Sequence, residues 1–273
     1  MSQHRKPQRT TGAVLRRMKE RGEKIACMTA YDASFARILE DSGIDVILVG
    51  DSLGMVIQGH DTTIPVTLAD MVYHTRCVAS TVSRALLMAD LPFLSYATPA
   101  QAVASAGRLM QEGGAVMVKL EGGPRQVEIV AHLSDQGIPI CAHLGLQPQR
   151  VHKLGGYRVQ GRDRQEAARL LEQAAALQEV GADLLLLECV PDLLAAEITQ
   201  NVEIPVIGIG AGSGCDGQIL VLQDVLGITP GGAPRFARDF LAGHKDIPGA
   251  IGAFVQAVRE GSFPASEHTF SSS

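Results

Sequence analysis

The sequence predicts an α/β fold, a single (β/α)8 TIM barrel with helical extensions at its N-terminal and C-terminal ends. Apolar, β-branched runs of about five residues alternate along the chain with amphipathic stretches of helical period. These runs are continuously apolar, which is typical of parallel strands covered on both faces. The 273 residues also match the roughly 250 that one such barrel needs. A doubly wound open sheet is the alternative that the same alternation allows.

The first expected element is a basic helix near residues 12–21, preceded by a disordered lead over residues 1–12. Because the lead is rich in arginine and poor in acidic residues, an organelle transit peptide is an alternative interpretation of it. No linker rich in glycine, proline or serine divides the chain, so residues 1–273 should form one domain. The eight expected strands span residues 24–29, 45–50, 85–89, 115–119, 138–142, 184–188, 205–209 and 224–228.

Capping residues place several of the helices between these strands. Thr98, Pro99 and Gln101 have the pattern of a capping box, which begins a helix that runs to Gly113. Further helices are expected over residues 163–180 and, beyond the eighth strand, over 248–260. Loops 51–70 and 143–161 are longer than ordinary connections, which favours lids or binding loops. Four glycines stand where a helix must end in a left-handed residue before the next strand: Gly43, Gly114, Gly137 and Gly181.

The composition argues against several classes of protein. A formal net charge of −5 does not suit a chain that grips nucleic acid or an anionic membrane surface. Aromatic residues make up only 4%, so stacking platforms for single-stranded nucleic acid are not expected. No apolar run reaches the length of about 18 residues that a membrane span requires. Five widely spaced cysteines without a Cys-x-x-Cys pair favour reduced thiols and a cytoplasmic protein.

Ionisable or polar residues follow consecutive strands at the point where each strand ends. The carboxyl ends of barrel strands share one rim, where active sites of this fold lie. Any one aspartate there could instead cap the next helix, but capping explains several carboxylates and a lysine on one rim less well. The residues at these ends are Asp51 and Ser52, Asp90, Lys119 and Glu121, His143, and Glu188.

Three of these carboxylates, Asp51, Asp90 and Glu121, come from neighbouring strands. An all-oxygen set of this kind suits a hard divalent cation such as Mg²⁺, which keeps several waters and takes substrate oxygens as further ligands. Lys119 lies two residues before Glu121, so strand periodicity places both on one face and directs the lysine at an anionic group of the substrate.

Glu188 emerges from an apolar run on the opposite side of the ring, and its partial desolvation there favours use as a general base. For His143 a structural role behind the metal ligands is as reasonable as a catalytic one. The glycine-rich stretch 208–212 allows two interpretations, a phosphate cradle or a close approach of the backbone to a bulky ligand.

In these residues and the segments around them the chain resembles the ketopantoate hydroxymethyltransferase family. The resemblance runs in order from about residue 14 to residue 268, and only the first dozen residues and two turns, 123–125 and 212–215, depart from it. The stretches that carry it are MTAYD (28–32), VGDSLGM (49–55), QGHDT (58–62), ADLPF (89–93), VKLEGG (118–123), AHLGL (142–146), GGYRVQG (155–161), LECV (187–190) and IGIGAG (207–212).

The resemblance implies a Mg²⁺-dependent transfer of a hydroxymethyl group from 5,10-methylenetetrahydrofolate to 3-methyl-2-oxobutanoate. The reaction proceeds through a Mg-stabilised enolate to 2-dehydropantoate (ketopantoate), in the first committed step of pantothenate biosynthesis. It also implies small-molecule partners and a homo-oligomer, in this family often a decamer. By motif, Asp51 and Asp90 would bind both the metal and the keto acid, Glu121 would complete the metal site, Ser52 and Lys119 would hold the substrate, and Glu188 would accept the proton.

Two other functions remain compatible with the same rim of residues. One is a carbon–carbon lyase that uses the same metal-stabilised enolate and needs no folate, and the other is a non-catalytic barrel that binds a keto acid. Turnover separates the three, because they give a folate-dependent product, folate-free cleavage, or binding alone.

Overall fold

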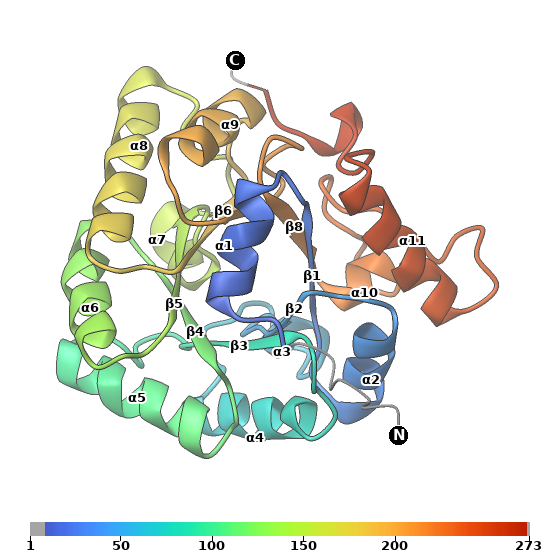
Figure 1. Cartoon of the computed structure of the whole chain (residues 1–273), viewed down its shortest axis with the longest axis horizontal. Helices are drawn as coiled ribbons and strands as arrows, with labels where there is room; N and C mark the ends of the chain where they lie inside the picture. The colour runs from blue at the N-terminus through green and yellow to red at the C-terminus, as the bar shows by residue number, and fades with distance from the viewer. Residues whose placement is uncertain (1–8, 272–273) are drawn as a thin grey trace, which may run out of the picture.

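The computed structural model describes residues 9–271, and within them eight parallel strands close into a barrel in the order of the sequence (Figure 1). β1 pairs with both β2 and β8, with Cys27 opposite Val46 and Ile219, and this pairing closes the ring. The expected (β/α)8 fold is confirmed. The strands are β1 (Ile25–Thr29), β2 (Val46–Val49), β3 (Leu86–Asp90), β4 (Met117–Glu121), β5 (Ile140–Gly145), β6 (Leu184–Glu188), β7 (Val206–Ile209) and β8 (Gly217–Leu220).

Helices surround the barrel and connect its strands, while α1 lies across one end of it (Figure 1). The α-helices are α1 (Gly12–Glu20), α2 (Ala33–Asp41), α3 (Leu53–Val56), α4 (Leu68–Ala79), α5 (Pro99–Gln111), α6 (Pro124–Asp135), α7 (Val151–Leu154), α8 (Arg164–Glu179), α9 (Asp192–Asn201), α10 (Leu222–Val225) and α11 (Ile247–Arg259). Two 3-10 turns, η1 (Pro148–Arg150) and η2 (Ser266–His268), complete the elements of the described chain.

Most expected helix boundaries agree with the structure. Thr98 caps α5 by accepting a hydrogen bond from the Gln101 backbone, and Asp163 caps α8. All four glycines expected to end helices have positive φ angles, from 75° at Gly137 to 102° at Gly181. Glycine adopts this conformation without the steric cost that a Cβ atom adds.

The eighth strand is the element that the sequence analysis placed wrongly. Helix α10 (222–225) takes up the start of the expected strand 224–228, and Gly227 follows the helix with a φ of 66°. The true β8 contains Gly217, where a Cβ atom would lie 2.4 Å from the Ile25 carbonyl oxygen, and the buried Gln218, which donates to the Gly212 carbonyl. Because a glycine and a glutamine take up half of this short strand, a search for apolar runs passes over it.

Helix α1 closes the end of the barrel from which the strands begin. Leu15 packs into the apolar interior of the barrel and is fully buried. Lys19 Nζ donates to the carbonyl oxygens of Thr199 at 2.8 Å and Ile204 at 3.0 Å, and pairs with Asp216 at 2.9 Å. Of the lead expected over residues 1–12, residues 1–8 lie outside the described chain, whereas Thr11 caps α1.

The inner faces of the strands pack in layers. In β4 the inward residues are Met117, Lys119 and Glu121, and in β6 they end with Leu186 and Glu188. The lower layers are apolar, and the charged residues lie in the layers nearest the carboxyl ends of the strands. The alternation of a β-strand therefore sets the height at which the functional side chains lie.

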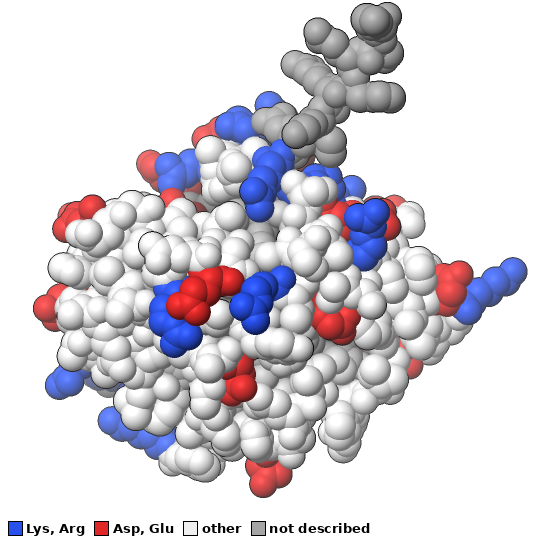
Figure 2. Space-filling view, turned by 90° about the horizontal axis from the view of Figure 1, so that it is seen from below, with Lys and Arg blue, Asp and Glu red and all other residues white. Residues whose placement is uncertain are grey.

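Acidic and basic side chains are interspersed on the face of the molecule shown in Figure 2. None of the helices described between residues 9 and 271 is long and apolar enough to cross a membrane. All five cysteines lie within the described chain and are free thiols, as the sequence analysis expected.

Glu40 of α2 generates a prediction about stability, because its carboxylate caps the start of β3. It accepts hydrogen bonds from the backbone N–H groups of Ser83 at 3.0 Å, Arg84 and Ala85 at 3.0 Å. Glu40→Ala leaves these buried donors without partners, so the free energy of unfolding should fall by about 2–4 kcal/mol. Denaturant unfolding measures this change, and Glu112→Ala, which removes an exposed carboxylate, should change it by less than about 0.5 kcal/mol.

The same contribution should depend on pH. Burial raises the pKa of Glu40, but the hydrogen bonds from Ala85, Arg84 and Ser83 outweigh it and lower the pKa below 4.5. The stabilisation is therefore present above pH 4.5 and is lost as the pH falls through the folded-state pKa. Equal stability loss in Glu40→Ala at pH 7 and at pH 3 would contradict this account.

Candidate active site

A cavity of about 520 Å³ opens at the carboxyl ends of the barrel strands. Its size lies within the range of pockets that bind small molecules. The structure brings all seven residues selected from the sequence into its lining: Asp51, Ser52, Asp90, Lys119, Glu121, His143 and Glu188. The convergence expected from the strand ends is therefore present.

The three carboxylates expected to bind a metal surround Lys119 on the β2–β4 side of the cavity. The Asp51 backbone N–H donates to Asp90 Oδ2 at 3.0 Å, which ties the end of β2 to the end of β3. Lys119 Nζ and Asp90 Oδ1 form an ion pair at 2.6 Å, but their geometry is not that of a hydrogen bond. This buried oxygen therefore has no hydrogen-bond partner in the described chain. Both side chains are almost completely buried.

Burial and the neighbouring charges shift the pKa values of Asp51 and Lys119. Burial, together with the carboxylates of Asp90 and Glu121, raises the pKa of Asp51 well above its usual value. For Lys119 burial lowers the pKa, but the surrounding carboxylates outweigh that effect and raise it. Lys119 is therefore a permanent cation at neutral pH, held where an anionic substrate group can reach it.

Gln149 and Tyr96 orient the carboxylates from outside the strands. Gln149 Nε2 donates to Asp51 Oδ2 at 2.9 Å, and the Gln149 backbone N–H donates to Glu121 Oε2 at 3.0 Å. Tyr96 Oη donates to Gln149 Oε1 at 2.5 Å. The sequence analysis did not select either residue, because they lie in loops without a motif; the length of loop 143–161 was the one pointer to Gln149.

His143 lies between two carboxylates at the centre of the rim. Its Nδ1 is 3.6 Å from Glu121 Oε1 and its Nε2 is 3.3 Å from Glu188 Oε2, in ion-pair contacts that are not hydrogen bonds. Burial and Lys119 lower the pKa of His143, but Glu121 and Glu188 outweigh them and raise it to about 9. The imidazole is therefore a cation at neutral pH, which the strand-end position alone did not predict.

Glu188 faces the cavity with 14% of its side chain exposed, against 2% for His143. Two backbone features hold it there. A Cβ atom on Gly145, whose φ is 91°, would lie 2.2 Å from the Glu188 carbonyl oxygen, so only glycine allows β5 to approach this closely. Cys189, the next residue, has a φ of 49°, which is rare for a residue other than glycine and marks a constrained backbone.

Both long loops and the C-terminal segment form the walls of the cavity. Met55 comes from loop 51–70 and Tyr157 from loop 143–161, and Tyr157 Oη lies 3.8 Å from Met55 Sδ. Phe236 and Phe270 line the cavity from the chain beyond β8. The expectation that the long loops are binding loops fits this placement.

The glycines of stretch 208–212 serve protein packing. A Cβ atom on Gly210 would lie 3.0 Å from the Phe236 ring, and one on Gly212 would lie 2.6 Å from Asp192 Cβ. Phe236 and α9 therefore occupy the space beside these glycines. Neither the phosphate cradle nor the close approach of a bulky ligand is needed to explain them.

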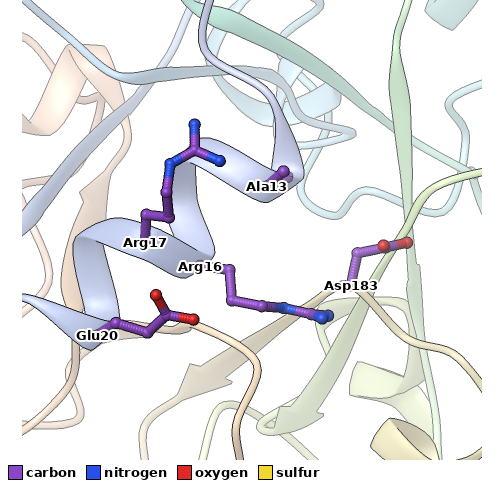
Figure 3. A pocket seen from close by; sticks show the side chains of 6 residues that line it. Ala13, Arg16, Arg17, Glu20 and Asp183 are labelled. Carbon is purple, nitrogen blue, oxygen red and sulfur yellow. The ribbon is translucent and has the colours of Figure 1, made fainter.

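A second pocket of about 330 Å³ lies at the opposite end of the barrel. Its lining combines Arg16, Arg17 and Glu20 of α1 with Asp183, and Figure 3 shows Arg16 extended toward Asp183. These opposite charges offset each other, and none of the residues selected from the sequence lies there.

The donor chemistry of the main cavity fits a hard divalent cation. No three His, Cys, Asp or Glu side chains in residues 9–271 form a complete metal-binding cluster on their own. Mg²⁺ does not require one, because it usually binds one or two carboxylates and completes its octahedron with waters and substrate oxygens. Asp90 Oδ1, which accepts no hydrogen bond in the described chain and is paired only with Lys119, and the neighbouring Asp51 offer such a partial set.

A family model described as ketopantoate hydroxymethyltransferase matches residues 9–266. The chain belongs to the ketopantoate hydroxymethyltransferase family. Curated relatives named 3-methyl-2-oxobutanoate hydroxymethyltransferase include one from Alkalilimnicola ehrlichii, 60% identical over 98% of this chain and 96% of its own. Another, from Halorhodospira halophila, is 57% identical over 95% of this chain and 94% of its own. As a member of the ketopantoate hydroxymethyltransferase family, the chain is a transferase enzyme.

Solved structures with a similar fold are much more distant in sequence. A putative lyase/mutase from Burkholderia cenocepacia matches with a TM-score of 0.60 and 18% identity, covering 94% of this chain and 97% of its own. Phosphonopyruvate hydrolase matches with a TM-score of 0.57 and 16% identity, covering 94% of this chain and 92% of its own. At such identities the likeness shows the barrel fold and nothing more.

The Gln149 network generates a prediction about activity. Gln149→Leu keeps the approximate volume but removes the side-chain donor to Asp51 and the acceptor for Tyr96. Because Asp51 then loses its fixed orientation, kcat/KM for hydroxymethyl transfer should fall about 10- to 100-fold. Steady-state kinetics measures this, with Gln160→Leu as the control in the same loop, since the Gln160 amide donates only to the Arg158 carbonyl. Equal kinetics in both variants would contradict a positioning role for Gln149.

Proposed function

We propose that the enzyme transfers a hydroxymethyl group from 5,10-methylenetetrahydrofolate to 3-methyl-2-oxobutanoate, giving 2-dehydropantoate. The observation that carries the proposal is the single cavity in which a cluster of carboxylates around Lys119 lies across from Glu188. The names of the curated relatives support the acceptor and the transferred group. Balance requires one water, whose oxygen becomes the hydroxyl group of the product.

We propose Mg²⁺ as the cofactor, held by Asp51 and Asp90 with Glu121 completing its site. Phosphonopyruvate hydrolase, which has the same fold, has been solved in complex with oxalate and Mg²⁺. In this chain four carboxylates face the two cations Lys119 and His143, and the excess of negative charge suits a divalent cation. Bound there, the metal would act as a Lewis acid that stabilises the enolate of the keto acid.

Other residues would hold the keto acid. Lys119 offsets the negative charge of its carboxylate and of the enolate. Ser52 Oγ lies 2.9 Å from Tyr31 Oη, so the tyrosine orients the hydroxyl that would contact the substrate. Buried surroundings strengthen both interactions, because little water competes for them.

Glu188 would accept the C3 proton of the keto acid, since it lines the cavity and is accessible from it. The imidazolium of His143, 3.3 Å from Glu188 Oε2, attracts this carboxylate and orients it in the cavity. The enolate would then attack the one-carbon unit of the folate. His143 thereby supports the base and does not touch the substrate carbon.

This reaction would be the first committed step of pantothenate biosynthesis, and we place it in the cytoplasm. The partners would be small molecules, with neither nucleic acid nor membrane involved. Conversion of 3-methyl-2-oxobutanoate in the presence of 5,10-methylenetetrahydrofolate and Mg²⁺ is the direct test. Keto acid cleavage without folate, or binding without turnover, would replace the proposal by a lyase or a binding protein.

The metal assignment predicts dependence on a divalent cation. Chelator treatment should abolish turnover and added Mg²⁺ should restore it. Asp90→Ala removes the oxygen that has no other hydrogen-bond partner in the described chain, so metal-dependent keto acid binding, measured by calorimetry, should weaken at least about tenfold. Full activity in a chelated, metal-free preparation would end this assignment.

The base assignment predicts a partial reaction. With Mg²⁺ and without folate, the wild-type enzyme should exchange the C3 hydrogen of 3-methyl-2-oxobutanoate with deuterated solvent. Glu188→Gln keeps the shape but cannot accept a proton, so exchange should slow by roughly 10²–10⁴-fold. NMR follows the C3 proton, and keto acid binding serves as the control because it should not change. Wild-type exchange in Glu188→Gln would move the base to another residue, with His143 the next to test.

We also propose that the native enzyme is a homo-oligomer, as large as a decamer. After β8, helix α11 packs its apolar face on β1 and α2 and covers the barrel, while the segment between β8 and α11 includes the exposed Ile228, which can contact a neighbouring subunit. Light scattering at micromolar concentration should therefore give a mass several times the 28.9 kDa of one chain. A mass of one chain would contradict it.

A further inference from the structure

The cavity has two halves of different chemistry, and one contains a carboxylate that has no role in the proposed reaction so far. The ends of β2 to β5 supply the charged cluster, whereas β8 and the segment after it form a mostly apolar wall that includes Val221, Pro230 and Phe236. Asp224 of α10 is the one carboxylate that the described chain beyond Glu188 adds to the lining. A single carboxylate in an apolar wall costs free energy unless a hydrogen-bond donor or a cation pairs with it.

Asp224 is only 4% exposed. Its Oδ1 accepts a hydrogen bond from Thr229 Oγ1 at 2.5 Å, and within residues 9–271 no cation pairs with the carboxylate. Oδ2 has no hydrogen-bond donor in the same described residues. Burial raises the pKa of Asp224, and the Thr229 hydrogen bond offsets this only in part. A buried carboxylate in this position favours a ligand that brings N–H donors.

We propose that Asp224 binds the 2-amino-4-oxopyrimidine edge of the tetrahydrofolate cosubstrate, an inference that rests on the proposed function. That edge presents two adjacent donors, N3–H and the exocyclic 2-amino group. They are spaced like the paired donors of a guanidinium, which a carboxylate accepts in a bidentate arrangement. Each carboxylate oxygen accepts more than one hydrogen bond, so Oδ1 can keep Thr229 while it accepts from the ring.

The rest of this half of the cavity fits such a ligand. The volume of about 520 Å³ exceeds what a five-carbon keto acid fills, and it leaves space for a bicyclic ring beside it. Val221, Pro230 and Phe236 offer apolar surface to the faces of that ring. The polar edge would meet Asp224 and the apolar faces would meet the wall.

The mouth of the cavity carries positive charge for the anionic tail of the cosubstrate. Arg158 and Arg235 line it, and neither forms an ion pair within the described chain. Arg235 is held in place, because its Nε donates to the Glu267 carbonyl at 3.1 Å and its guanidinium lies 5.6 Å from the centre of the Phe270 ring. Guanidinium groups bind carboxylates such as those of the glutamyl tail.

The test compares the folate-dependent reaction with the folate-free exchange of the C3 hydrogen. Asp224→Asn keeps the shape and the Thr229 hydrogen bond but presents an amide N–H₂ to the donors of the ring. KM for methylenetetrahydrofolate should rise about 10- to 100-fold, while C3 exchange with Mg²⁺ and keto acid alone stays within about twofold of wild type. Asp239→Asn, which changes a carboxylate of the same segment outside the cavity, should leave both measurements unchanged.

A cosubstrate analogue identifies the contact itself. Methylenetetrahydrofolate with hydrogen in place of the 2-amino group lacks one of the two donors, so the ratio of KM between Asp224→Asn and wild type should shrink at least about fivefold with it. The same ratio with both cosubstrates would show that Asp224 acts by shaping the wall, and would overturn the proposal.

Two further results would also overturn it: an unchanged KM in Asp224→Asn, or a loss of C3 exchange in that variant. Failure of the proposed function is distinguishable from these outcomes, since wild-type enzyme would then exchange the C3 hydrogen without folate-dependent turnover, or would do neither.

Discussion

The register of the barrel strands is the constraint on which the rest of this structure depends. Along a strand every second residue points inward, and the inward residues change from apolar to ionisable between one and the next. This change occurs from Met117 to Lys119 in β4 and from Leu186 to Glu188 in β6. Parallel pairing places Asp90 opposite Lys119 and Glu121 opposite His143, so the ionisable side chains of neighbouring strands lie side by side. A shift of one residue in either strand would turn its charged side chain toward the helices and place an apolar one in the cavity.

That arrangement places charges where water is scarce, and the charges compensate one another. Lys119 pairs with Asp90, and His143 lies between Glu121 and Glu188. Buried ion pairs contribute little to stability because desolvation opposes the attraction between the charges. The layers of apolar residues below, and the helices packed outside, therefore supply the stability of the barrel, and the rim is left to chemistry.

The sequence predicted most of this rim because strand position alone places its residues. Asp90 and Glu188 are the last residues of their strands, so a search of strand ends finds them. It could not find Tyr96 and Gln149, whose contacts depend on how two loops fold back over the rim. It could not find the charge of His143 either, since that charge results from distances to two carboxylates of other strands.

The eighth strand shows the limit of the same method in the fold. Apolar runs identify strands that are covered on both faces by side chains, but β8 meets β1 so closely that Gly217 has no space for a side chain. The barrel closes here because Gly217 lacks a side chain, and hydrophobic periodicity does not detect a missing side chain. The convergence of the rim residues was predicted correctly despite this error, because the rim of β8 carries none of the residues selected for catalysis.

Helix α1 has a consequence for the way the chain is made. It is synthesised before every strand of the barrel, yet Lys19 contacts the carbonyl groups of residues 180 and 185 positions later in the chain, and Asp216 follows later still. Loop closure over such a separation is slow, and during synthesis it must also wait for translation to reach β8. Until then Leu15 remains without its burial site, and a segment as short as α1 has little helical stability of its own.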